Sequence, residues 1–114
     1  MAASLAACGP TKPPSDVLGA ATRNLAAAQS SGAATYAPIE LKSAQDHLAK
    51  ANAASARQDY DDAAVLASES GVDSELAAAK SRLGKAREAV DALKRQNADL
   101  ERDAARHGEG ASEQ

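Results

Sequence analysis

The feature that most constrains this chain is that its hydrophobic residues are mostly alanine. Hydrophobic residues make up 44% of the sequence, yet aromatic residues make up only 2%, with no Phe and no Trp. A large buried side chain contributes roughly 1.5–3 kcal/mol and alanine contributes much less, so a wide globular core is not expected. Alanine has the best intrinsic helix propensity, whereas the residues that favour strands are scarce and scattered. The sequence therefore predicts close-packed helices and no β-sheet.

Size and charge exclude several classes of protein. The 114 residues provide one small domain. The net charge is −3, with both signs interspersed and no basic block, which argues against nucleic-acid binding. No run approaches the roughly 18 apolar residues of a membrane span. The single cysteine, Cys8, can form neither an intramolecular disulfide nor a cysteine metal cluster.

The N-terminal residues contain a lipobox pattern, Leu5-Ala6-Ala7-Cys8. Small residues before the cleaved bond suit a signal peptidase, and the thiol of Cys8 can carry a diacylglycerol whose acyl chains hold the protein to a membrane. Residues 1–7 are interpreted as a truncated signal-peptide remnant, because they lack a basic segment and a full apolar segment. Residues 8–14 are interpreted as a lipid-anchor tether. If the recorded start is genuine, the expected location is instead cytoplasmic.

Three helices are expected in an Ala-rich helical domain over residues 15–107. Ser15 is the expected cap of the first, which ends at Ser30-Ser31-Gly32. Pro38 suits the first position of the second helix, and residues 57–59 form a corner. The third helix begins with three aspartates near Asp59 and is expected to reach about His107, with a break between residues 70 and 73 left open. Residues 108–114 are predicted to form a disordered tail.

The C-terminal part of the third helix carries a heptad repeat. Two columns of residues at coiled-coil spacing form a predicted interaction seam: Leu76, Ala79, Leu83, Ala86, Val90, Leu93, Asn97 and Leu100. Asn97 is the polar residue of the seam and is either a register device or merely exposed. In a parallel homodimer Arg82 would face Arg87 of the second copy, which is unfavourable. The seam is therefore expected to pair with an earlier helix, with an antiparallel copy or with another protein.

The predicted fold class is all-α. We expect an antiparallel helical hairpin or a short three-helix unit, extended by a long overhanging C-terminal helix of coiled-coil type. The second helix has about 20 residues, or roughly 30 Å, and the third is about twice as long, so it should extend past the hairpin.

Two segments carry a resemblance to a known family: residues 36–41, Tyr-Ala-Pro-Ile-Glu-Leu, and residues 58–64, Gln-Asp-Tyr-Asp-Asp-Ala-Ala. With Ala44, Leu48 and Ala51 between them, the chain resembles an uncharacterised bacterial family of small Ala-rich helical-hairpin lipoproteins. Some members are fused ahead of an OmpA-like peptidoglycan-binding domain. The likeness covers about residues 18–83 and implies a location and a shape, with no established activity.

No pattern of catalytic, metal-binding or cofactor-binding residues is recognised. The aspartates at 59, 61 and 62 lack the glycine and glutamate that a calcium loop would need near positions 64 and 70. His47 and His107 are far apart in the sequence and lie among polar residues, so metal ligation is not expected. No nucleophile elbow or glycine-rich phosphate loop is present. The chain is therefore expected not to be an enzyme and to use no cofactor, metal or small-molecule substrate.

Two functional hypotheses follow. In the first, acyl chains on Cys8 anchor the protein to the periplasmic face of the bacterial outer membrane, where the helices act as a spacer or docking surface. By resemblance to proteobacterial lipoproteins, Gly9 after the cysteine lacks the usual inner-membrane retention mark. In the alternative, the chain is a soluble coiled-coil interaction module whose cysteine is incidental. Its partner would be another protein or a second copy.

Overall fold

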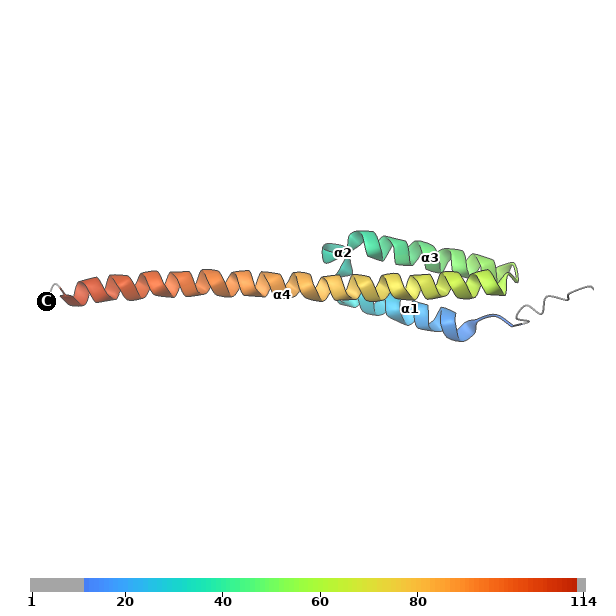
Figure 1. Ribbon diagram of the computed structural model, residues 1–114, viewed down its shortest axis with the longest axis horizontal. Coiled ribbons are helices and arrows are strands. Elements are labelled where there is room, and N and C mark those ends of the chain that lie inside the picture. Colours follow the sequence, from blue (N-terminus) through green and yellow to red (C-terminus); the bar gives the residue numbers. More distant parts are fainter. Residues whose placement is uncertain (1–11, 113–114) are drawn as a thin grey trace, which may run out of the picture. The chain divides into compact units, whose positions relative to one another are not determined.

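The computed structural model describes residues 12–112, and these consist of helices and short connections (Figure 1). The helices are α1 (Ser15–Ser30), α2 (Ala33–Tyr36), α3 (Pro38–Ala56) and α4 (Tyr60–Ser112). The predictions of an all-α fold and of a long C-terminal helix are confirmed. The predicted lipobox, Cys8 and most of the tether lie outside the described residues.

Two prolines and one glycine determine where the first helices begin and end. Ser15 is the first residue of α1 and makes no capping hydrogen bond, so its prediction as the cap is wrong; Pro14 occupies that position. After α1, Gly32 adopts a left-handed conformation with φ of 93°, which glycine tolerates without strain. One helical turn, α2, follows and was not predicted. Pro38 stands at the start of α3 as predicted.

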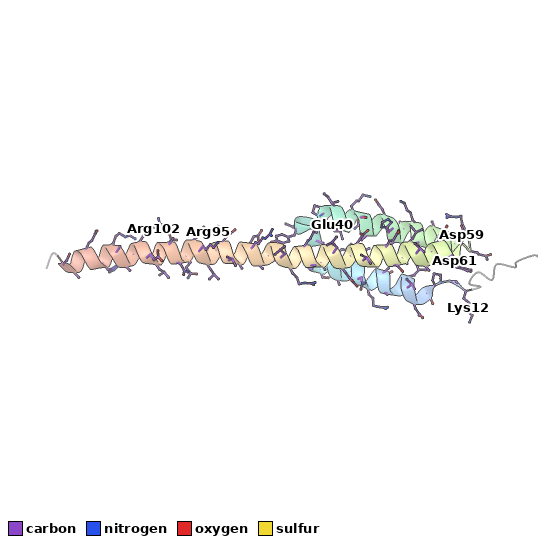
Figure 2. All side chains as sticks on the ribbon, viewed as in Figure 1. Lys12, Glu40, Asp59, Asp61, Arg95 and Arg102 are labelled. Atoms are coloured by element: carbon purple, nitrogen blue, oxygen red, sulfur yellow. The ribbon has the colours of Figure 1, made fainter. Side chains whose placement is uncertain are left out.

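The corner between α3 and α4 lies at residues 57–59, as predicted. The backbone N–H of Asp59 donates to the carbonyl of Ala54 at 2.9 Å, which closes the turn. Gln58 adopts a φ of 67°, the left-handed conformation that side chains other than glycine rarely take. Asp61 and Asp62 then lie in the first turn of α4, where the helix dipole favours negative charge (Figure 2).

Helix α4 is continuous from Tyr60 to Ser112, over 53 residues. The helix does not break between residues 70 and 73, a possibility that the sequence left open. A lone glycine such as Gly71 costs a helix only about 1 kcal/mol, and no proline follows it to end the helix. The predicted end near His107 is wrong, because residues 108–112, which were assigned to the disordered tail, belong to the helix. The helix continues past Gly110, and the hydroxyl of Ser112 donates to the carbonyl of Glu109 at 2.9 Å. Again no proline or left-handed glycine stops it.

The chain divides into two units, residues 1–81 and 82–114. In the first unit α1, α3 and α4 up to Ser81 run up, down and up (Figure 1). The short three-helix unit is therefore the form adopted, rather than a simple hairpin. Within residues 82–112 the second unit consists of the rest of α4, and none of its side chains is buried.

The core of the first unit is built almost entirely from alanine. Leu41 is its one buried leucine. The buried alanines on α1 and α3 are Ala21, Ala28, Ala44, Ala51 and Ala54. Leu18, Leu25 and Leu48 are half-buried at the edges of this core. Small side chains let the helices approach closely, which is how a chain without Phe or Trp forms a core.

Helix α4 contributes a small-residue face to this core. Six Ala and Ser side chains alternate at spacings of four and three and are each at most 1% exposed: Ala63, Ala67, Ser70, Ser74, Ala77 and Ser81. The hydroxyl of Ser70 donates to the carbonyl of Ala44 at 2.8 Å and so joins α4 to α3. The hydroxyls of Ser74 and Ser81 donate within α4, to the carbonyls of Ser70 and Ala77. All three buried hydroxyls are therefore hydrogen-bonded.

Candidate interaction surface

The predicted seam lies on a different face of α4 from the one that packs in the core. In the first unit Leu76 is 46% exposed and Ala79 is also exposed, although Ala77 and Ala78 beside them are buried. Within the first unit, these two seam residues therefore lie outside the core that α4 forms with the earlier helices. The reason is steric: the Ala and Ser face lets the helices approach more closely than a row of leucines would.

The part of the seam in the second unit is exposed along its whole length. Leu83 is 49% exposed, Val90 48%, and Leu93 and Leu100 58% each. Ala86 and Asn97 complete the face and are also exposed. These positions recur at spacings of three and four, so they share one side of the helix. The exposure of Asn97 leaves both of its interpretations open.

The flanks of this face carry charged side chains. Asp103, at one edge of the face, pairs with Arg106. On the outer side of the helix Asp99 pairs with Arg102, as its spacing suggests. A shallow groove beside the face is lined by Leu83, Ala86, Arg87, Val90, Asp91 and Lys94. An apolar face bordered by charged side chains is typical of an amphipathic helix that packs against a partner.

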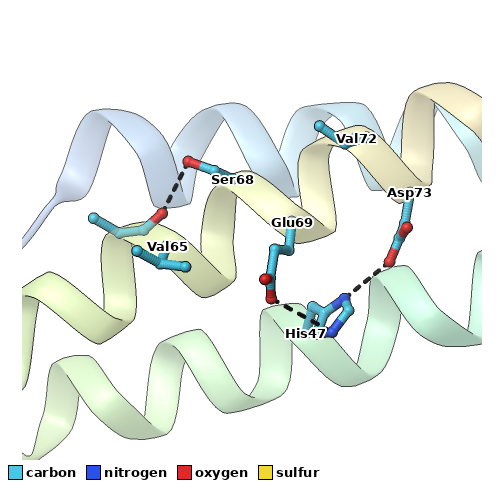
Figure 3. A pocket seen from close by; sticks show the side chains of 7 residues that line it. His47, Val65, Ser68, Glu69, Val72 and Asp73 are labelled. Atoms are coloured by element: carbon cyan, nitrogen blue, oxygen red, sulfur yellow. Dashed lines mark hydrogen bonds and ion pairs between the residues drawn. The ribbon is translucent and has the colours of Figure 1, made fainter.

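A second apolar groove lies in the first unit, and the sequence reasoning missed it. Val65 and Val72 are 58% and 65% exposed and stand two heptads and one heptad, respectively, before Ala79. With Ala64, Ser68 and three charged or polar side chains from α3 and α4 they line a groove of about 580 Å³ (Figure 3). Stepping back from Ala79 by seven residues would have found both valines; the possible break near Gly71 obscured the repeat.

The polar side of this groove joins α3 to α4. One oxygen of the Asp73 carboxylate accepts from the hydroxyl of Ser43 at 2.6 Å and lies 2.8 Å from Nδ1 of His47. Nε2 of His47 is 3.6 Å from the carboxylate of Glu69 (Figure 3). His47 is therefore a half-buried interhelical residue, which its sequence surroundings did not reveal.

The same three residue types occur in hydrolytic triads, but here they are connected differently. A triad requires the serine hydroxyl to donate to histidine while the aspartate holds the other ring nitrogen. In this protein Ser43 and His47 both meet Asp73, so nothing activates the hydroxyl as a nucleophile. Over residues 12–112 no group of three or more His, Cys, Asp or Glu side chains is placed to hold a metal ion.

Two ion pairs shift the pKa of a carboxyl group. Lys80 donates to Glu40, which lowers the pKa of that carboxyl and ties the start of α3 to α4. Lys42 donates to Asp46 and lowers its pKa. Lys50 stands four residues after Asp46, but the ion pair forms with Lys42, one turn earlier.

Comparison with known proteins shows the family but not a function. Within the described residues no helix is both long and apolar enough to span a membrane. No curated protein and no solved structure matches the chain significantly. A family model described as a domain of unknown function matches residues 16–93, which is more than half of the chain and includes the three-helix unit. The chain therefore belongs to this family of uncharacterised domains, DUF4398.

Proposed function

We propose that the protein is a non-enzymatic, lipid-anchored envelope protein whose helix α4 provides a docking surface for another helix. The observation that carries the docking role is the exposed apolar face of the second unit, with Leu83, Val90, Leu93 and Leu100 each about half exposed. Soluble proteins rarely expose a continuous apolar stripe unless it binds something. Covering each of these side chains would contribute on the order of 1 kcal/mol, half of the value for full burial.

Helix α4 has two faces, a buried face of small residues and an exposed face of larger apolar residues, and this difference supports the docking role. Within the first unit the small-residue face packs on α1 and α3, so the fold does not need the larger apolar residues. Four aliphatic side chains at coiled-coil spacing are left outside that core, where a partner helix would cover them.

The anchor rests on the sequence. Leu5, Ala6 and Ala7 before Cys8 fit a lipobox, and two or three acyl chains on Cys8 would give stable membrane attachment. Gly9 favours the outer membrane over the inner one. The proposed location is therefore the periplasmic face of the outer membrane, and the proposed partners are the membrane and a helical protein.

The exposed face also favours a second candidate, a soluble coiled-coil module that needs no anchor. Expression in a proteobacterium from the genomic locus, with its upstream DNA, separates the two. A detergent-phase species that begins at Cys8 and carries a diacyl or triacyl mass supports the anchored form, and Cys8→Ser should release it into the aqueous phase. An unmodified water-soluble chain that retains Met1 would refute the anchor.

The docking role is tested separately by a matched pair of variants. Leu93→Asp places a charge on the exposed face, whereas Ala92→Asp places the same charge beside it, outside the seam. Capture of a partner from cross-linked envelopes should be lost with Leu93→Asp and kept with Ala92→Asp. Equal capture by both variants would show that this face does not bind.

A further inference from the structure

The charges that flank the exposed face of the second unit change sign along the helix. In the heptad defined by the seam, the flanking positions are those directly before the first column and directly after the second column. The first column is Leu76, Leu83, Val90 and Asn97, continued one heptad on by Ala104, and the second is Ala79, Ala86, Leu93 and Leu100. The N-terminal half has Arg82, Arg87 and Lys94 at the flanking positions, and the C-terminal half has Glu101 and Asp103. A helix with one basic and one acidic half is complementary to itself when its copy is reversed.

We infer that the occupant of this face is a second copy of the same chain, paired antiparallel through the second unit. This inference rests on the proposed docking role and specifies its partner. In the best register Leu83 lies opposite Leu100 of the second copy, and Val90 lies opposite Leu93. Ala86 then lies opposite Asn97, where a small neighbour leaves room for water at the amide.

The flanking charges favour antiparallel over parallel pairing. Arg82 meets Asp103 of the second copy, and the two-fold axis repeats that pair. Arg87 lies near Lys94 of the second copy, which is unfavourable, but Asp91 lines the same groove as both side chains and reduces their repulsion. In a parallel dimer Arg82 would instead face Arg87, and no flanking pair of opposite charge would form.

Antiparallel registers shifted by one heptad are worse. One shift places Arg87 opposite its own copy. The other brings Arg87 to Glu101 of the second copy, but it places Lys94 opposite its own copy. It also sets Asn97 against Leu93, which buries the amide beside a large apolar side chain. Within the second unit, the register with Leu83 opposite Leu100 pairs the largest apolar side chains with one another and also forms the two Arg82–Asp103 pairs.

Cysteine cross-linking tests the direction of pairing on the full chain. Cys8→Ser removes the one native cysteine, and Leu83→Cys or Leu100→Cys then introduces a single new one. These positions are separated by about 26 Å along the helix, whereas a disulfide needs Cα atoms within about 7 Å. The antiparallel dimer predicts a disulfide in the mixture of the two variants and none in either variant alone. Homodimeric disulfides in each variant alone would show parallel pairing and overturn the inference.

Charge reversal provides an independent test by sedimentation. Arg82→Glu should weaken the dimer about tenfold, since two attractive pairs become repulsive. Asp103→Arg should do the same, and the two changes together should restore the affinity. Arg95→Glu, the same change on the opposite side of the helix, is the control. In a parallel dimer Arg82→Glu would strengthen association, because it would face Arg87.

Self-association and docking fail in different ways. A chain that sediments at 11.5 kDa at concentrations up to about 1 mM would overturn the antiparallel dimer. Suppose that the chain is monomeric but that it captures a different protein in cross-linked envelopes, and that Leu93→Asp abolishes this capture. The docking role would then stand, with that protein as the partner. If that variant had no effect either, both would be wrong.

Discussion

The alanine core makes a strong prediction about Ala51. This residue is fully buried on α3, where it meets Ala21 of α1 and Ala67 of α4, each 1% exposed. In Ala51→Leu an isobutyl group replaces a methyl at the point where three helices converge, and the helices must separate to admit it. Such overpacking costs about 1–3 kcal/mol, and a site closed on all sides by alanine should lie at the upper end.

The control is Ala49→Leu, the same change two residues away on the exposed side of α3. Exposed substitutions of this kind usually change stability by less than about 0.5 kcal/mol. A unit of this size is expected to have a free energy of unfolding of only about 5 kcal/mol, so Ala51→Leu should remove around half of it.

Urea unfolding followed by tyrosine fluorescence measures this difference. Tyr36 and Tyr60 are the only aromatic residues and both lie in the first unit, so the signal reports that unit alone. The midpoint should fall clearly for Ala51→Leu and hardly move for Ala49→Leu. Equal midpoints, or a higher one for Ala51→Leu, would refute the view that close approach through alanine holds the helices together.

Three further changes test other contacts by the same measurement. Ser70→Ala removes the hydrogen bond to α3 and should cost about 1 kcal/mol, whereas Ser74→Ala should cost less because its hydroxyl bonds within α4; equal costs would contradict this. Because Lys80 lowers the pKa of Glu40, their pair stabilises the fold above the ordinary pKa of 4.5 and this contribution is lost as the pH falls through the lowered value. In the Glu40→Gln variant the urea midpoint should therefore fall less steeply as the pH is lowered than it does in the unchanged protein. An equally steep fall in both would count against the pair. Gln58→Gly should raise stability by about 1 kcal/mol by relieving the left-handed backbone, and a lower midpoint would argue that no strain is present.

The helices and their boundaries were largely readable from the sequence. Pro38 marks the start of α3, Gly32 marks the end of α1, and residues 57–59 form the predicted corner before Tyr60. These signals are local, since each depends on the conformations open to one residue. The C-terminal end of α4 was misjudged for the same reason: Gly108 weakens a helix but does not stop it.

The choice of packing face could not be predicted from hydrophobicity alone. Leu76, Leu83 and Leu93 dominate any apolar pattern in α4, yet the helix packs through Ala63, Ser70 and other small residues. The sequence contains both the aliphatic repeat and the small-residue repeat. The small-residue repeat forms the packing face because it lets the helices approach more closely, and this depends on the shape of all three helices together.

The polar contacts between α3 and α4 also could not be predicted from the sequence. Ser43 and His47 lie one turn apart on α3, but only the antiparallel register brings them to Asp73. That register is set by the alanines along the whole interface. The residues next to His47 in the sequence are polar, so they did not indicate that Asp73 and Glu69 of α4 are its partners.

The central claim is that the exposed face of the second unit binds another helix. Photo-cross-linking in living cells tests it most directly, with a photoreactive amino acid placed at Leu93 on that face or at Arg95 on the opposite side of α4. We predict a discrete adduct from position 93, either with a second copy or with another protein, and none from position 95. No adduct from position 93, or the same adducts from both positions, would contradict the claim.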